Sequence, residues 1–287
     1  MTTSDRGETV RRLLTIVQLT LHEAMRRRVL LAALVCGAAF LVLYATGFHF
    51  VERDLRQNAA MPLLQRRLTL NLFVLAGLFA VNFLSVMTAV MLPVDTLSGE
   101  ITSGVMQTLA AKPVRRAEIL LGKWAAYLIL VVGYLAVMAG GVLLVARALG
   151  RFTPPHVASG LPLMALECAL LVTLSIAGGT RFSAVTNGVA VLGLHGLAFI
   201  GNWVEQIGTL VGNDAARSIG TVASLLMPSE SLWQLAASRM QPALMRELHL
   251  TPFSPASVPS PAMVVWAAGY LVVALLLGLR QFQRRSL

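Results

Sequence analysis

The stretch LNLFVLAGLFAVNFLSVMTAVML, residues 70–92, has 23 residues and no charged side chain. A helix needs about 20 apolar residues to cross the hydrocarbon core of a membrane, whereas a strand of a membrane barrel needs only about 9–11. Five further runs have this character, interrupted only by Glu167 in one and His195 in another. The six predicted spans are residues 29–48, 70–92, 124–146, 161–179, 182–203 and 262–279. The sequence therefore predicts an all-α polytopic membrane protein with six transmembrane helices.

The composition supports this class. Of the 287 residues 56% are hydrophobic and 13% are charged, about half the charged share of a soluble domain. With the N-terminus in the cytoplasm, 14 of the 23 lysines and arginines fall in cytoplasmic segments, as the positive-inside rule requires. We therefore attribute the net charge of +10 to topology and lipid contact and not to nucleic acid, because no aromatic and basic platform accompanies it.

The segments around the spans divide the chain further. Residues 9–26, TVRRLLTIVQLTLHEAMR, have apolar side chains at helical spacing and basic ones elsewhere, which is typical of an interfacial helix. The first span follows a charged lead without a cleavage site, so no signal peptide is expected. We expect a cytoplasmic N-terminus with an elbow helix at 1–28, a transmembrane domain at 29–282, a re-entrant or interfacial outer segment at 204–261, and a cytoplasmic tail at 283–287.

One polar block lies between the second and third spans. Residues 95–123 read DTLSGEITSGVMQTLAAKPVRRAEILLGK, with apolar residues at near-helical spacing on both sides of Pro113. Gly99 and Gly104 permit sharp bends or a close backbone approach. A solvated linker needs no apolar face, so we expect this block to dock on a cytoplasmic partner or on the headgroup layer.

The order of residues in this block resembles the first cytoplasmic loop of type-2 ABC transporter permeases, also called type V exporters. The elbow helix, the six spans and the stretch LLMPSESLW at 225–233 are also similar to that family. The loop departs from the family pattern at ITS after Glu100 and at LAAK before Pro113, so its docking surface is expected to differ in detail. The resemblance assigns ATPase coupling to Asp95, Gly99, Glu100, Gly104, Pro113, Arg115, Arg116 and Glu118.

The resemblance implies a permease subunit for ATP-driven export by alternating access in the bacterial inner membrane. Its expected partners are two copies of a cytoplasmic ABC ATPase, a second identical or homologous permease, and membrane lipid; an accessory subunit stays open. The ATPase would hold ATP and Mg, and this chain would hold no cofactor. Glu100 would pair with an arginine of the ATPase. The sequence contains no phosphate loop, Gly-x4-Gly-Lys-Ser/Thr, so we expect no enzymatic activity of its own.

Polar residues inside spans are candidates for function. In this family the second and fifth spans line the translocation cleft, and each span here places three polar residues on one face. Interhelical hydrogen bonding is the alternative role for such residues. The resemblance assigns the lining to Asn71, Asn82, Ser85, Asn187, His195 and Asn202.

Four alternatives stay open on the sequence. Glu167 and Cys168 are adjacent and point about 100° apart on a helix, which disfavours a shared metal. Met87 and Met91 could share a soft-ligand face for Cu(I), and some relatives form a multicopper-enzyme-maturation permease group. An intramembrane hydrolase would use Glu167 or His195, but no catalytic motif has useful spacing. An import permease would carry a Glu-Ala-Ala loop, which is not found.

Overall fold

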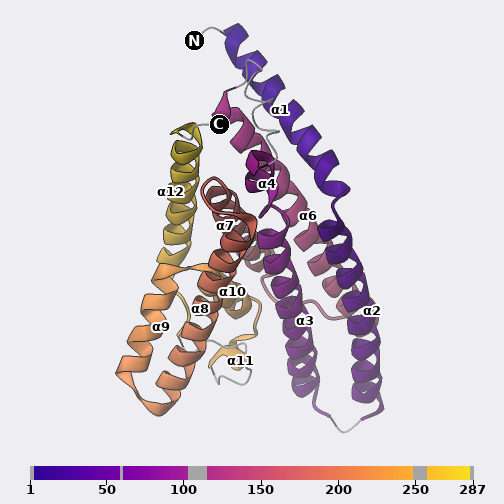
Figure 1. Ribbon diagram of the computed structural model, residues 1–287. Coiled ribbons are helices and arrows are strands. Elements are labelled where there is room, and N and C mark those ends of the chain that lie inside the picture. Colours follow the sequence, from indigo (N-terminus) through magenta and orange to yellow (C-terminus); the bar gives the residue numbers. More distant parts are fainter. Residues whose placement is uncertain (1–2, 59–60, 103–114, 248–256, 285–287) are drawn as a thin grey trace.

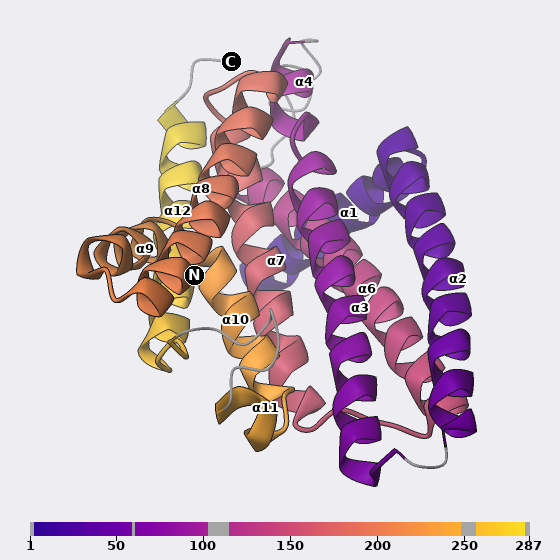
Figure 2. The same ribbon diagram turned by 90° about the horizontal axis from the view of Figure 1, so that it is seen from below.

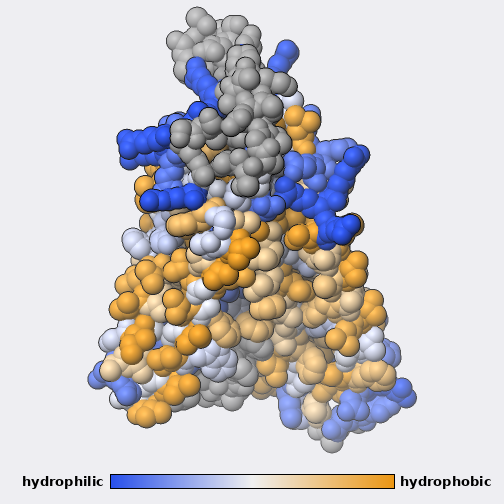
Figure 3. Space-filling view, in the orientation of Figure 1, coloured by the Kyte–Doolittle hydropathy of each residue, from blue (hydrophilic) through white to orange (hydrophobic). Residues whose placement is uncertain are grey.

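We describe a computed structural model of the chain for residues 3–58, 61–102, 115–247 and 257–284. Six long helices are apolar enough to cross a membrane, and the described residues include no strand. These helices are α2 (Arg28–Gln57), α3 (Leu63–Met91), α6 (Arg116–Gly150), α7 (Val157–Gly179), α8 (Ala184–Val211) and α12 (Ala262–Arg284). The predicted all-α polytopic membrane fold is confirmed, and Figure 3 shows a broad apolar surface between hydrophilic ends.

Five other helices complete the described part of the chain. They are α1 (Thr3–Met25), α4 (Thr96–Thr102), α9 (Asp214–Leu226), α10 (Ser229–Arg239) and α11 (Ala243–Glu247). The start of α1, α4 and the end of α12 lie at one end of the bundle, called the α4 end below (Figure 1). α11 and the connection between α2 and α3 lie at the opposite end, called the α11 end.

The helices α3 and α7 form the centre of the bundle. In the most apolar window of α7, 67% of the residues are buried, against 11% in α2. Figure 2 places α2 at one side of the bundle and α9 at the other. The outward faces of α2, α8 and α12 carry many exposed aliphatic side chains, as expected for helices that contact lipid or another membrane chain.

The spanning helices extend beyond the apolar runs because charged residues near their ends form ion pairs and capping hydrogen bonds. α2 continues to Gln57 although 49–57 is polar, since Glu52 pairs with Arg56 and with Arg66 of α3. α6 starts eight residues before the predicted span. Its first turn is capped by Glu118, whose Oε2 accepts a hydrogen bond from the Arg115 backbone N–H at 3.3 Å. Reciprocal capping of this kind stabilises a helix start.

The expected re-entrant segment forms a tight hairpin with α8. A Cβ on Gly208 of α8 would lie 2.6 Å from Ala216 of α9, and Gly201 meets Ala223 in the same way. The two helix backbones can therefore approach closely only because small residues line their contact. At the start of α9, the Asn213 side chain accepts hydrogen bonds from the backbone N–H groups of Ala215 and Ala216.

The helix α10 starts at Ser229 and is buried against α7. Trp233 is only 3% exposed and the neighbouring alanines are fully covered. Serine and alanine make up almost half of α10, and their small side chains let it pack between longer helices. Met240 at its end packs on Gly160 of α7.

Candidate functional site

The short helix α4 is attached to the first turns of α6 by two polar contacts. Thr96 Oγ1 donates a hydrogen bond to Tyr127 Oη at 2.5 Å, and both side chains are buried. Lys123 Nζ donates to Glu100 Oε1 in an ion pair. These contacts join residues 31 and 23 positions apart. They place the described part of the polar block on the start of the third spanning helix.

Glu100 has a partner within the chain, and its pairing with an arginine of the ATPase stays a prediction. The side chain of Glu100 is 15% exposed and that of Lys123 only 5%, so the pair is shielded from water on most sides. Sequence reasoning placed an ATPase arginine opposite Glu100 and did not identify Lys123 as its partner within the chain. The signal was a lysine at the start of an apolar run, since such a base needs a buried counter-charge.

Helix α1 attaches to the same part of α6. Gly122 faces Ile16, and a Cβ on this glycine would lie 2.6 Å from Ile16 Cγ2. Beyond α1, Arg27 Nη2 donates to Glu23 Oε1 at 2.7 Å across the junction with α2. The first two turns of α6 therefore carry both the predicted elbow helix and α4. The location of α1 in the membrane interface stays a prediction.

The basic residues of the polar block have separate structural contacts. Arg116 Nη1 donates to the backbone oxygen of Gln283 at 3.3 Å, which connects α6 to the end of α12. Arg115 is exposed and precedes α6. Glu118 is only 5% exposed and caps the first turn of α6. Its contacts are those of a helix cap.

The remaining predicted coupling residues lie before α4 or outside the described residues. Asp95 is exposed, and its side chain bends over Gly99, where a Cβ would lie 2.8 Å from Asp95 Oδ1. Gly99 therefore allows this close approach. Gly104 and Pro113 lie outside the described residues, so their coupling role stays a prediction.

A comparison with family models places this architecture. The model of the ABC-2 family transporter protein matches residues 14–287, which is nearly the whole chain. The chain belongs to the ABC-2 transporter family. It is therefore a permease subunit of an ABC transporter. Permeases of this family are transport subunits that are generally not enzymes themselves and generally work with an ABC ATPase. A comparison with curated proteins found no match.

Within this ABC-2 chain, four of the six predicted lining residues bond to neighbouring elements. Their contacts are Asn71 Nδ2 to Met240 O at 3.1 Å, Asn187 Nδ2 to Ser175 O at 2.6 Å, His195 Nδ1 with Ser229 Oγ at 2.9 Å, and Asn202 Nδ2 to Glu230 Oε1 at 3.3 Å. Asn71, Asn187 and His195 are buried and Asn202 is half-buried. Asn187 and Asn202 line different pockets. A lining role in a complete transporter stays a prediction.

The other two lie near a buried acid in the centre of the bundle. Asn82 Oδ1 and Ser85 Oγ of α3 are buried without a hydrogen-bond partner, and so are both carboxyl oxygens of Glu167. Glu167 is fully buried on α7 and lies within electrostatic range of Glu230. Among the described residues, no three His, Cys, Asp or Glu side chains gather as metal ligands.

Sequence reasoning missed Glu230 as a functional candidate. It occupies the first turn of α10, is 6% exposed, and has the neutral Asn202 amide as a hydrogen-bond donor. Burial raises the pKa of Glu230 from 4.5 to about 7, because removal from water penalises the charged form. The sequence feature that could have identified Glu230 is a single acid in the otherwise uncharged stretch LLMPSESLW.

Proposed function

We propose that this permease subunit forms an export pathway by alternating access, together with a second identical or homologous permease. A separate cytoplasmic ATPase, present in two copies and holding ATP and Mg, would dock on the block at 95–123. The observation that carries the proposal is the attachment of α4 to α6. A docked ATPase that displaces α4 would act directly on a spanning helix through Glu100–Lys123 and Thr96–Tyr127.

The charge distribution supports a cytoplasmic α4 end. Arg115, Arg116 and Lys123 of the polar block lie there, close to α4 and to the end of α12. Figure 3 shows hydrophilic side chains around this end of the apolar surface. Cytoplasmic ends of membrane proteins carry an excess of lysine and arginine. Both termini would then be cytoplasmic, in a bacterial inner membrane.

Copper handling is not included in this proposal. Met87 and Met91 both pack against the hydrophobic core, where methionine commonly fills irregular gaps. These contacts favour a packing role for the two thioethers. Membership of the multicopper-enzyme-maturation group would therefore need support from copper binding itself.

Exchanging the charges of Glu100 and Lys123 tests whether α4 couples the ATPase to the permease. The tagged chain, purified from its native membrane in mild detergent, should retain an ABC ATPase. Glu100→Lys should lower the ATP hydrolysis of the complex at least tenfold, because two cations would face each other at a partly buried position. The double variant Glu100→Lys/Lys123→Glu should restore hydrolysis if the pair acts as the mechanical connection.

Two results would contradict the proposal. The first is a wild-type chain that retains no ATPase. The second is a Glu100→Lys complex with unchanged hydrolysis. Glu52→Gln is the matched control, because Glu52 is a similarly paired acid at the α11 end and should leave hydrolysis unchanged. A double variant that stays inactive would assign Glu100 to direct contact with the ATPase.

A further inference from the structure

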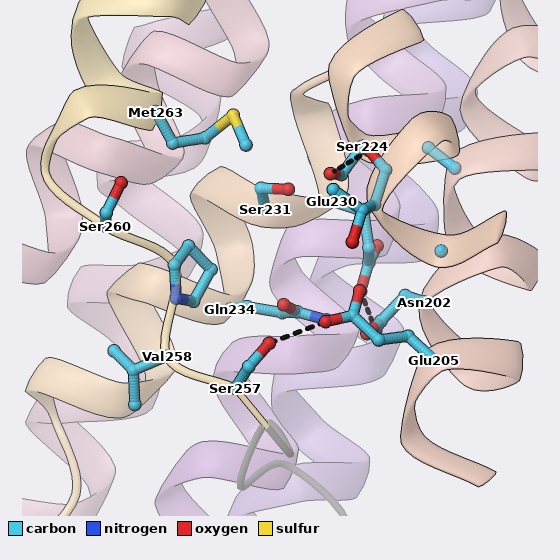
Figure 4. Close-up of a pocket in the computed structure, with 14 residues that line it drawn as sticks. Asn202, Glu205, Ser224, Glu230, Ser231, Gln234, Ser257, Val258, Ser260 and Met263 are labelled. Carbon is cyan, nitrogen blue, oxygen red and sulfur yellow. Dashed lines mark hydrogen bonds between the residues drawn. The ribbon is translucent and has the colours of Figure 1, made fainter. Parts of the chain in front are cut away.

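A polar pocket of about 190 Å³ opens between α8, α9, α10 and the start of α12. Figure 4 shows Glu205 and Glu230 extending into this space from α8 and α10, with several hydroxyl groups around them. Glu230 lies inside the bundle, beside the buried Glu167. An ionisable residue at such a position is costly and generally marks a binding or transport site. The hydroxyl groups come from Thr221, Ser224, Ser231, Ser257 and Ser260.

Among the described residues, only neutral side chains donate hydrogen bonds to Glu205 and Glu230. Ser257 Oγ donates to Glu205 Oε1 at 2.6 Å, and Asn202 Nδ2 donates to Glu230 Oε1 at 3.3 Å. No lysine, arginine or histidine is among the described residues that line the pocket. A buried carboxylate without a counter-charge is unfavourable. The pocket is therefore electrostatically complementary to a positive charge and unsuited to an anion.

Close packing of the helix backbones fixes the positions of Glu205 and Glu230. Gly220 of α9 packs on Glu205, and a Cβ there would lie 2.9 Å from Glu205 Oε2 and 2.8 Å from the Gly201 backbone oxygen. Any larger residue at this position would displace the carboxylate or the hairpin. Glu230 is held by the burial of α10. Both acids thus have fixed positions in a packed region.

A second, smaller pocket of about 70 Å³ adjoins the first and shares Asn202, Glu230 and Gln234 with it. Its other walls include four aromatic rings. The rings form two pairs, Phe79 with Trp233 at a centroid distance of 5.6 Å and Phe199 with Trp203 at 6.4 Å. Aromatic faces attract cations, and alkylated ammonium groups are recognised by such cages. Glu230 therefore lies between the aromatic side chains of the smaller pocket and the polar side chains of the larger one.

We propose that the two pockets form one binding site for an organic ammonium cation, with Glu230 as its counter-ion. The alkyl groups of the cation would contact the aromatic walls, while Glu205 and the hydroxyls would bind polar substituents. A small metal ion fits less well, because it needs a shell of oxygen ligands and one wall here is aromatic. This binding site does not depend on the proposed ATPase coupling, since the isolated chain contains all of it.

Choline tests the proposal directly, because it combines a quaternary ammonium group with a hydroxyl. Binding of radiolabelled choline is measured on the purified full chain in lipid nanodiscs, without ATPase. The measurement is made at pH 8 and fixed ionic strength. Its neutral carbon isostere 3,3-dimethylbutan-1-ol serves as competitor. Saturable choline binding that the isostere displaces at least tenfold less well than unlabelled choline is the expected result.

Four variants locate the site. Glu230→Gln keeps the size of the side chain and removes its charge, so choline affinity should fall at least tenfold. Glu247→Gln, at an exposed acid on α11, is the matched control and should leave the affinity unchanged. Trp233→Leu should weaken binding about fivefold, whereas Trp233→Phe should retain most of it, because only the phenylalanine preserves an aromatic face.

Several outcomes would overturn the proposal. They are the absence of saturable choline binding, equal displacement by the neutral isostere, and equal effects of Glu230→Gln and Glu247→Gln. If Glu230→Gln does not give a monodisperse protein, Glu205→Gln replaces it and should lower affinity at least threefold; unchanged affinity there would also contradict the site. Loss of ATPase coupling with intact choline binding would reject the proposed function alone.

Discussion

Buried acids at the ends of the bundle differ from those at its centre in what faces them. At the α4 end Glu100 faces Lys123, and at the α11 end Glu52 faces Arg56 and Arg66. In the interior, Glu167 lies beside the neutral Asn82 and Glu230 accepts a hydrogen bond from the neutral Asn202. The pairs at the ends join two opposite charges. The interior acids have no counter-charge among the described residues, which distinguishes groups that hold the fold from groups that are open to a proton or a ligand.

The two kinds of acid site should respond differently in protein stability when they are substituted. Removing one member of a buried ion pair leaves an uncompensated charge and costs about 3–5 kcal/mol. Replacing a buried polar group that lacks partners with an apolar group of similar shape is nearly neutral or stabilising. Opposite signs are therefore expected for substitutions at the two kinds of acid site.

The largest effect is expected at the α4 end. Lys123→Met should lower the free energy of unfolding by about 3 kcal/mol, the lower part of the range for buried pairs, because Glu100 keeps some exposure. Thermal unfolding in detergent measures this. Arg181→Met, at an exposed base of the same end, should change stability by less than about 0.5 kcal/mol. Equal shifts for both variants would show that the Glu100–Lys123 pair contributes nothing to the fold.

An intermediate, pH-dependent effect is expected at Glu230. The folded form holds its proton up to about pH 7, whereas 4.5 is the ordinary value. The stabilisation is therefore complete below about pH 4.5 and is lost as pH rises through 7. Removal from water keeps the proton bound, whereas the hydrogen bond from Asn202 favours the charged form. The titratable groups around Glu230 are Glu167 of α7 and Glu205 and His195 of α8.

Glu230→Gln removes this dependence. Relative to wild type, the variant should gain about 2 kcal/mol between pH 5 and pH 8, measured as the difference in thermal unfolding at the two values. Glu247→Gln provides the exposed comparison. A wild-type stability profile that is flat over this range, or one that Glu230→Gln leaves unaltered, would mean that Glu230 has a counter-charge after all.

The smallest effect is expected at Glu167. Glu167→Met should stabilise the protein by about 1 kcal/mol, because a buried acid without partners is replaced by a flexible apolar side chain. Leu166→Met at the neighbouring position should be close to neutral. Thermal unfolding of the two variants separates them. A loss of stability in Glu167→Met beyond that of Leu166→Met would assign Glu167 to the paired class.

The sequence predicts the six spans well because each has about 20 residues with almost no charge, a pattern that few other structures produce. The helices extend past these spans, since the turns at 49–57 and 116–123 are polar and become helical through Glu52 and Glu118. The burial of α10 is not apparent from its serine and alanine content. Small size, which allows α10 to pack inside the bundle, has no periodic signature in the sequence.

Prediction of the site stops at contacts between distant segments. Glu100 is identifiable from its motif, but Lys123 becomes its partner only because α4 folds back onto α6. The pocket at Glu205 and Glu230 is assembled from four helices and a connecting segment. No single stretch carries its residues at a regular spacing, so its charge and its aromatic wall appear only after the helices are packed.

The hairpin of α8 and α9 constrains how the chain is made. α9 has 13 residues, about 20 Å of helix, whereas the hydrocarbon core is about 30 Å thick. Its partner surface is the backbone of α8 at Gly201 and Gly208. During synthesis α8 must therefore leave the insertion machinery first and serve as the template on which α9 folds back.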